Sequence, residues 1–106
     1  MLHTHLKNIE EREVVPGYHG QFIHSDTMTV AHWNIEAHHD MPEHTHPHEQ
    51  IFNLLEGTFE LTVAGETVVA ESGTVVVIPA NVKHAGRSLS DCRVIDIFHP
   101  VRKEYQ

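Results

Sequence analysis

Four side chains with metal-binding donor atoms lie in two separate segments of the chain. His44 and His46 are two residues apart, Gln50 follows shortly after, and His84 stands much further along. Because side chains of an extended segment alternate between two faces, His44 and His46 are expected to point the same way. Three imidazoles and one amide oxygen suit a divalent ion such as Ni, Zn, Mn, Fe or Co. The sequence therefore predicts one divalent metal ion, with coordination positions left open for water or substrate.

Two neighbouring residues compete for these ligand positions. Glu49 is adjacent to Gln50 and carries a stronger donor, but alternation places it on the opposite face of the strand. His48 has the right parity, yet it lies in the bend expected at Pro47. We therefore expect His48 behind the ligands or at the rim of a pocket, with a place on the surface as the alternative.

An acidic residue interrupts the apolar segment Val94-Ile95-Asp96-Ile97-Phe98 near the C-terminus. Burying an unpaired carboxylate is costly, so Asp96 must meet a cation, hydrogen-bond donors or water in a cavity. If Asp96 faces inward, Phe98 does so too. The metal and any nearby arginine would then set the pKa of Asp96, as expected of a general acid–base group. The alternative is a structural ion pair between this carboxylate and Arg87, Arg93 or Arg102.

Size and charge exclude several classes of function. The 106 residues suffice for one domain, and the formal net charge is −8 with histidines neutral. The seven lysines and arginines are scattered, which argues against nucleic-acid binding. The single cysteine, Cys92, excludes an internal disulfide, and no apolar run suits a membrane span or signal peptide. We expect a soluble cytoplasmic protein that binds neither nucleic acid nor membrane.

The elements that must position these groups are short strands separated by turn residues. Expected strands cover residues 20–24, 27–36, 50–55, 58–63, 67–70, 74–78 and 93–98. No segment keeps a helical period, so any helix should be short, and the pattern predicts an all-β sandwich or barrel. The uninterrupted apolar run 75–78 predicts a strand buried on both faces. Residues 1–17 are expected to form an N-terminal arm, and residues 18–106 the barrel.

The donor spacing resembles the two motifs of the cupin family. The first, HxH, three or four residues, Glu, six residues, Gly, is matched by His44, His46, Gln50 and Gly57. The second, Gly, five residues, Pro-x-Gly, two residues, His, is matched by Gly73, Pro79, Asn81 and His84. The resemblance implies a single-domain cupin, which is a double-stranded β-helix or jelly-roll barrel. It also implies a homodimer, in which the arm could pair with a neighbouring subunit's sheet and cover its edge.

Two positions depart from the family pattern. Gln50 stands where Glu is usual, so the site keeps more of the ion's positive charge, which favours Lewis-acid chemistry and an anionic substrate. Asn81 replaces the glycine of the second motif, and asparagine also tolerates a positive φ. Histidines that only pack, as in cupins that have lost their metal, are the alternative interpretation of the motif.

The pattern Asp96-x-Phe98-x-x-x-Arg102 resembles the C-terminus of the KdgF-type cupins, the pectin-degradation proteins. These open the ring of 4,5-unsaturated uronate monosaccharides to linear 5-keto-4-deoxyuronates. The resemblance implies that Asp96 shuttles a proton, Phe98 gives the sugar an apolar floor and Arg102 clamps the uronate carboxylate. The expected activity is therefore an isomerase-like ring opening of a small anionic sugar in uronate metabolism. A metal-dependent dioxygenase of the cupin type and a non-catalytic module for sugar or metal are the alternatives.

Overall fold

A computed structural model describes residues 3–106; residues 1 and 2 of the predicted arm lie outside the described part of the chain. In chain order the elements are η1 (Leu6–Asn8), β1 (Arg12–Val15), β2 (Tyr18–His24), β3 (Thr29–Ile35), β4 (Asp40–His44), β5 (Glu49–Glu56), β6 (Phe59–Val63), β7 (Glu66–Ala70), β8 (Val75–Ile78), β9 (His84–Ser88), β10 (Cys92–His99) and η2 (Lys103–Tyr105). The all-β prediction with short helices is confirmed. No helix within residues 3–106 is long and apolar enough to cross a membrane.

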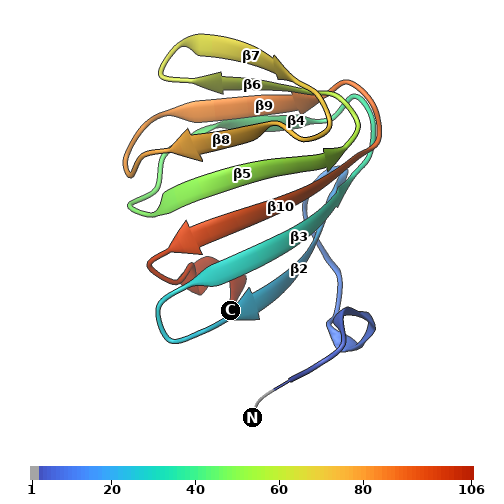
Figure 1. The fold of residues 1–106 in the computed structure, drawn as a ribbon, viewed down its shortest axis with the longest axis vertical. Helices are drawn as coiled ribbons and strands as arrows, with labels where there is room; N and C mark the ends of the chain where they lie inside the picture. The colour runs from blue at the N-terminus through green and yellow to red at the C-terminus, as the bar shows by residue number, and fades with distance from the viewer. Residues whose placement is uncertain (1–2) are drawn as a thin grey trace.

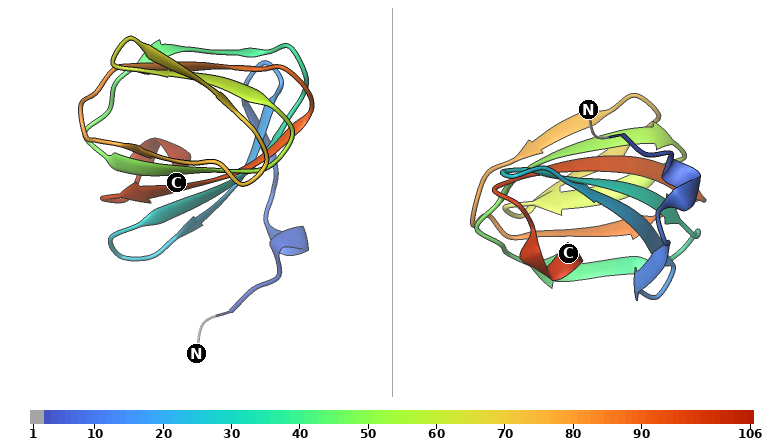
Figure 2. Two further views of the ribbon diagram at one scale, coloured as in Figure 1. Left: turned by 45° about the horizontal axis from the view of Figure 1, so that its top comes forward. Right: turned by 90° about the horizontal axis from the view of Figure 1, so that it is seen from below.

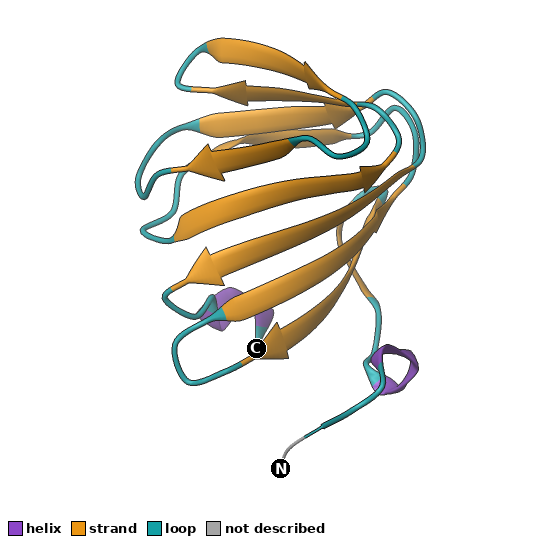
Figure 3. Ribbon diagram, in the orientation of Figure 1, coloured by secondary structure: helices purple, strands orange, loops and turns teal. Residues whose placement is uncertain are grey.

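The strands form two antiparallel sheets that pack face to face (Figure 1; Figure 3). The larger sheet has the order β1-β2-β3-β10-β5-β8, and the smaller sheet has the order β4-β9-β6-β7. Strands distant in sequence are neighbours in both sheets, for example β3 with β10 and β4 with β9. The sheets close around a common interior (Figure 2), which is the architecture of a jelly-roll barrel.

Alternation along the strands fills this interior with two kinds of side chain. The apolar core joins the two sheets through residues such as Trp33, Phe52, Leu54, Phe59 and Leu61. The buried polar residues include His46, Gln50, His84 and Asp96. Because a buried polar group needs a partner to offset its desolvation, this polar set is the candidate functional site.

Part of the predicted arm belongs to the chain's own sheet. Strand β1 pairs with β2 in antiparallel register, so residues 12–15 form the edge strand of the chain's own larger sheet. The segment before β1 is also fastened, because the side-chain amide of Gln21 donates to the backbone oxygens of Leu6 and Ile9 at 2.9 and 2.8 Å. The arm therefore lies against the edge of the larger sheet.

Strand β8 is more exposed than its composition predicts. Ile78 is fully buried, but Val75 is 58% exposed and Val77 is 64% exposed. The prediction that this run is buried on both faces is wrong, because β8 is an edge strand and only its inner side meets the core. Its outer side leaves two branched aliphatic side chains in contact with solvent.

Candidate metal centre and pocket

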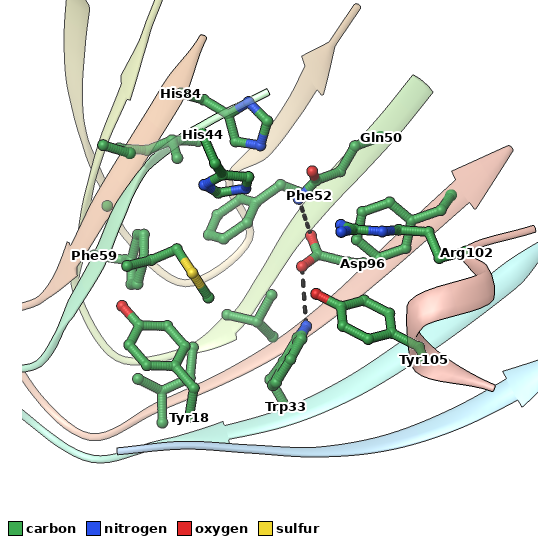
Figure 4. Close-up of a pocket in the computed structure, with 17 residues that line it drawn as sticks. Tyr18, Trp33, His44, Gln50, Phe52, Phe59, His84, Asp96, Arg102 and Tyr105 are labelled. Carbon is green, nitrogen blue, oxygen red and sulfur yellow. Dashed lines mark hydrogen bonds between the residues drawn. The ribbon is translucent and has the colours of Figure 1, made fainter. Parts of the chain in front are cut away.

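Three elements bring the predicted histidines together. His44 ends β4, His84 begins β9, and the two are register partners in the smaller sheet. His46 lies in the loop after β4. One ring nitrogen from each of the three falls within 4.8 Å of the others, and Figure 4 shows His44 and His84 facing the same pocket. These imidazoles are close enough to hold one divalent metal ion.

The corner that carries His84 is tied to the loop that carries His46. Asn81 adopts φ +64°, the conformation for which its motif position usually has glycine, and this confirms the expectation for that substitution. The backbone N–H of Asn81 donates to the carbonyl oxygen of His46 at 2.9 Å. Two motifs that are distant in sequence are thereby joined by a main-chain hydrogen bond directly behind the site.

Each imidazole turns its Nδ1 atom toward a backbone carbonyl. The distances are 2.7 Å from His44 to Pro42, 3.1 Å from His46 to His48 and 2.9 Å from His84 to Val82. Because a carbonyl oxygen can only accept, Nδ1 carries the proton in each ring and Nε2 keeps its lone pair. Main-chain carbonyls that orient ligand imidazoles in this way are usual around protein-bound metals.

Two of these lone pairs have surroundings that fit a cation. Nε2 of His84 is buried, and nothing within residues 3–106 donates a hydrogen bond to it. Nε2 of His46 lies 3.1 Å from Oε1 of Gln50, so two acceptor atoms face each other. Two ligands that each lie about 2.1 Å from one ion would be separated by about this distance. The donor set therefore fits a divalent metal ion.

Burial keeps two of the rings neutral. Desolvation, assisted by the positive charge of Arg102, lowers the pKa of His46 to about 4. Desolvation is also the largest cause that lowers the pKa of His84. Since only a neutral imidazole can bind a metal, the apolar surroundings favour the metal-binding form at neutral pH.

Asp96 organises the polar side of the pocket. The amide nitrogen of Gln50 donates to one carboxylate oxygen at 2.9 Å, and the indole N–H of Trp33 donates to the other at 3.0 Å (Figure 4). Because a carboxylate only accepts, the first contact fixes the Gln50 amide with its oxygen toward His46. Burial raises the pKa of Asp96 to about 6, against the opposing effects of these two hydrogen bonds.

The structural ion pairs considered for Asp96 do not form within residues 3–106. Arg87 pairs instead with Asp40 at the surface, and Arg102 pairs with Glu104. Arg93 lies on the outer face of β10, because it alternates with the inward-facing Val94. Asp96 is therefore held by neutral donors, which leaves its charge available to the pocket.

This arrangement gives a physical reason for glutamine at position 50. In the variant Gln50→Glu, two carboxylates would meet where a donor and an acceptor now lie, and one of them must take up a proton. We expect metal binding to persist and the acid limb of the pH–rate profile to move upward by about one unit, so that the rate falls about 10-fold at pH 5 but only about 2-fold at pH 7. Glu49→Gln, on the exposed face of the same strand, is the matched control and should keep the wild-type profile. An unshifted profile in Gln50→Glu would contradict this role.

Arg102 is stacked between two aromatic rings. Its guanidinium carbon lies 4.8 Å from the ring centre of Phe98 and 4.4 Å from that of Tyr105. Its Nε donates to Glu104 at 2.7 Å, and its Nη2 contacts the same oxygen. The backbone N–H of Arg102 donates to the side chain of Thr29 at 2.9 Å. The side chain is therefore a fixed, buried cation on one wall of the pocket.

The pocket also contains residues that the sequence did not indicate. Tyr105 lines it beside Arg102, and the backbone oxygen of Tyr105 accepts from Arg12 at 2.6 Å and from His24 at 3.1 Å. Glu104 lines a second hollow that continues outward past Arg102 and Arg12. In the sequence, only their closeness to Arg102 could have indicated Tyr105 and Glu104, because no motif marks a three-residue 3-10 helix.

Several further residues surround the ligand side chains. His48 is buried, and its carbonyl holds the ring of His46, so it lies behind the ligands. Glu49 is exposed, whereas Gln50 faces inward. Trp33 is buried in the core and also donates to Asp96. Phe98 faces inward beneath the guanidinium of Arg102.

Sequence and fold comparisons agree on the family. Residues 31–98 match the model described as "Cupin domain", and the chain belongs to the cupin family. It is a small cupin that resembles KdgF. The structure of KdgF from a Halomonas species is similar over 94% of both chains, with a TM-score of 0.88 and 25% sequence identity.

Other relatives support the fold. An RmlC-like cupin from Shewanella frigidimarina has a TM-score of 0.92 at 21% identity, over 97% of this chain and 94% of that one. Salicylate 1,2-dioxygenase from Pseudoaminobacter salicylatoxidans has a TM-score of 0.78 at 17% identity, over 82% of this chain but only 26% of its own. An uncharacterised protein of Streptomyces coelicolor is 30% identical over 91 residues, which is 85% of this chain and 87% of that protein.

Proposed function

We propose that this cupin opens the ring of a 4,5-unsaturated uronate monosaccharide to give the linear 5-keto-4-deoxyuronate. The observation that carries the proposal is the position of Asp96, a buried carboxylate one hydrogen bond from Gln50 and on the same pocket as His44, His84 and Arg102. The similarity to KdgF from Halomonas over nearly the whole chain supports it.

The reaction moves one proton and needs no oxidant. The hydroxyl at C1 loses its proton, the bond between C1 and the ring oxygen breaks, and C1 becomes an aldehyde. The ring oxygen is left as an enolate on C5, and protonation at C4 converts it to the ketone. A single carboxylate can accept the first proton and deliver it to C4, and a pKa of about 6 suits both roles near neutral pH.

The remaining residues bind and orient. His44, His46, His84 and the oxygen of Gln50 would hold one divalent metal ion, which we propose to be Ni, Zn, Mn, Fe or Co. Such an ion supplies Lewis-acid polarisation of a substrate oxygen. The amide of Gln50 and the indole of Trp33 keep both oxygens of Asp96 in fixed positions. The apolar walls exclude water around this carboxylate.

Two arginines give an acidic chain a place for an anionic substrate. Arg102 lines the pocket, and Arg12 and Arg102 both line the hollow that continues outward from it. Glu104 occupies one edge of the Arg102 guanidinium, which leaves its Nη1 for a substrate carboxylate. Phe98 and Tyr105 hold the guanidinium plane, so the cation is oriented before substrate arrives.

The variant Arg102→Lys should separate binding from proton transfer. Lysine keeps the charge but loses the planar group that stacks between Phe98 and Tyr105 and that holds its free nitrogen in a fixed direction. We expect KM for the uronate to rise about 10-fold or more, with kcat changed less than about 3-fold. The exposed Lys103→Arg is the control. A fall in kcat at unchanged KM would show that Arg102 acts on the reacting atoms instead.

Absorbance and oxygen measurements on one reaction test the function. With the Ni, Zn or Mn form, we expect the ultraviolet absorbance of the unsaturated uronate to fall while dissolved oxygen stays constant. Unchanged absorbance with every metal would refute ring opening and leave a binding module. Oxygen consumption by the Fe(II) form, with a phenolic acid, thiol or diketone as substrate, would favour a dioxygenase.

A further inference from the structure

The hydroxyl of Tyr105 lines the pocket without a hydrogen-bond partner. Figure 4 shows it pointing into the pocket next to Asp96, and no hydrogen bond joins it to any group within residues 3–106. Tyr105 ends the short helix η2, close to the C-terminus of the chain. A polar group that the protein leaves unpaired on a pocket wall is available to a ligand.

Aromatic and cationic neighbours hold the Tyr105 ring in one orientation. The ring of Phe22 stacks on it with 4.4 Å between the ring centres, and the guanidinium carbon of Arg102 also lies 4.4 Å from its centre. The rings of Trp33 and Phe98 approach it edge-on, each with 5.9 Å between centres. The hydroxyl therefore has a fixed direction before any substrate binds, as stabilisation of a developing charge requires.

The other neutral side-chain donors that line the pocket within residues 3–106 already have acceptors. The amide of Gln50 and the indole of Trp33 donate to Asp96. The hydroxyl of Tyr18 donates to a backbone oxygen at 3.0 Å, and the ligand imidazoles donate to backbone carbonyls as described above. The phenol of Tyr105 is therefore the neutral donor that remains for a substrate.

Ring opening of a uronate creates an oxygen anion that needs such a donor. When the bond between C1 and the ring oxygen breaks, this oxygen is left with the negative charge of the enolate. It is bonded to C5, and C5 also carries the carboxylate expected at Arg102. Because the Tyr105 ring stacks on the guanidinium of Arg102, its hydroxyl lies on the C5 side of a substrate bound in this way.

Tyr105 and the metal ligands lie on different sides of Asp96. One carboxylate oxygen accepts from Gln50, and the other accepts from Trp33, whose ring contacts Tyr105. Figure 4 shows the same division, with His44 on the Gln50 side. The Tyr105 hydroxyl is therefore placed to reach a different substrate oxygen from the one that faces the metal ligands.

We propose that Tyr105 is a further catalytic residue of the proposed ring opening, on which this role rests, and that its hydroxyl donates a hydrogen bond to the ring oxygen as that oxygen becomes an enolate. Tyr105 keeps its own proton throughout. Asp96 moves the proton from the C1 hydroxyl to C4, and the hydrogen bond from Tyr105 is strongest while the oxygen carries charge. Burial raises the pKa of Tyr105, against the opposing charge of Arg102, so the phenol remains a donor at neutral pH.

The variant Tyr105→Phe removes the hydroxyl and keeps the ring that stacks on Arg102. We expect kcat to fall about 10²-fold, as is usual when one donor to an oxyanion is lost, with KM changed less than about 3-fold. The acid limb of the pH–rate profile should stay in place, because Asp96 is unchanged. Tyr105→Leu, which removes the ring as well, should lower kcat similarly and also raise KM. Tyr18→Phe is the matched control, because the Tyr18 hydroxyl already has an acceptor, and both constants should stay within about 3-fold of the wild type.

Steady-state kinetics of these variants distinguish the role of Tyr105 from ring opening itself. If the wild-type protein turns the uronate over and Tyr105→Phe retains its kcat, the role of Tyr105 is wrong and the proposed function stands. A raised KM at unchanged kcat in Tyr105→Phe would also overturn the role, since the hydroxyl would then only bind the unreacted sugar. An equal loss of kcat in Tyr18→Phe would do the same. Absence of turnover by the wild-type protein would refute the proposed function and this role together.

Discussion

Asp96→Asn is expected to lower kcat for uronate ring opening by about 10³-fold while making the metal-free protein more stable at pH 7. The loss of turnover follows because an amide cannot accept and return the proton, and general acid–base groups typically contribute 10²–10⁴-fold. Asparagine keeps the size of the side chain and can still accept the hydrogen bond from Gln50. A variant that gains stability and loses turnover separates a catalytic carboxylate from a structural one.

The gain in stability follows from the sign of the pKa change. Burial raises the pKa of Asp96 from 3.8 to about 6, so the folded chain binds this proton more tightly than the unfolded chain. Ionisation of Asp96 therefore lowers the free energy of unfolding. The loss is small below about pH 4, grows as the pH rises to about 6, and reaches about 3 kcal/mol above that. The variant also loses the hydrogen bond from Trp33, which destabilises it by about 1 kcal/mol.

Thermal unfolding of chelator-treated protein between pH 4 and pH 8 measures this difference. Asp96→Asn should be up to about 1 kcal/mol less stable than the wild type at pH 4 and about 2 kcal/mol more stable at pH 7. Asp26→Asn, in the exposed turn before β3, is the control and should match the wild type in stability and turnover. If Asp96→Asn destabilises the protein at every pH, the carboxylate is a structural acceptor and the proton-transfer role is wrong.

His84→Ala is expected to abolish stoichiometric metal binding and, with it, turnover. The substitution removes the buried Nε2 that no other group within residues 3–106 satisfies, together with the ring that packs against His44 and His46. Metal affinity should fall by more than about 10²-fold, because removing a ligand costs more than removing the groups that orient one. Elemental analysis after dialysis and a parallel ultraviolet assay give both quantities.

An exposed histidine provides the control for this variant. His99 ends β10 at the surface, and His99→Ala should retain both metal and activity. The metal-free wild-type protein should behave like His84→Ala in the ultraviolet assay. Full activity in His84→Ala, or in the chelated wild-type protein, would remove the metal from the proposed reaction.

Local pattern predicted most of the architecture. Short runs rich in apolar and β-branched residues, bounded by turn residues, located β2, β3, β5, β6, β7, β8 and β10 to within a few residues. Strands β1, β4 and β9 were missed because they lack such runs: β4 contains Pro42, and β9 has Gly86 next to Arg87. Their strand character comes from pairing with distant partners, which no local window contains.

The site was predictable where spacing alone determines contact. His44, His46 and His84 converge as the two motifs imply, and alternation placed Gln50 rather than Glu49 on the inner face. The partners of Asp96 were not predictable. An ion pair with an arginine and a hydrogen bond from Trp33 can each satisfy a buried carboxylate, and the sequence does not show which donor lies beside it. The contact of Arg102 with Tyr105 depends on a short terminal turn that leaves no periodic signal.

X-ray absorption of the metal-loaded protein tests the metal centre most directly. We predict one ion per chain whose nearest neighbours are three imidazole nitrogens, with oxygen in every remaining position. Gln50→Ala should lose one of those oxygens or exchange it for water and leave the three imidazoles unchanged. A bound ion with fewer than three imidazole neighbours, or a purified protein that takes up no ion at all, would contradict the site built from His44, His46 and His84.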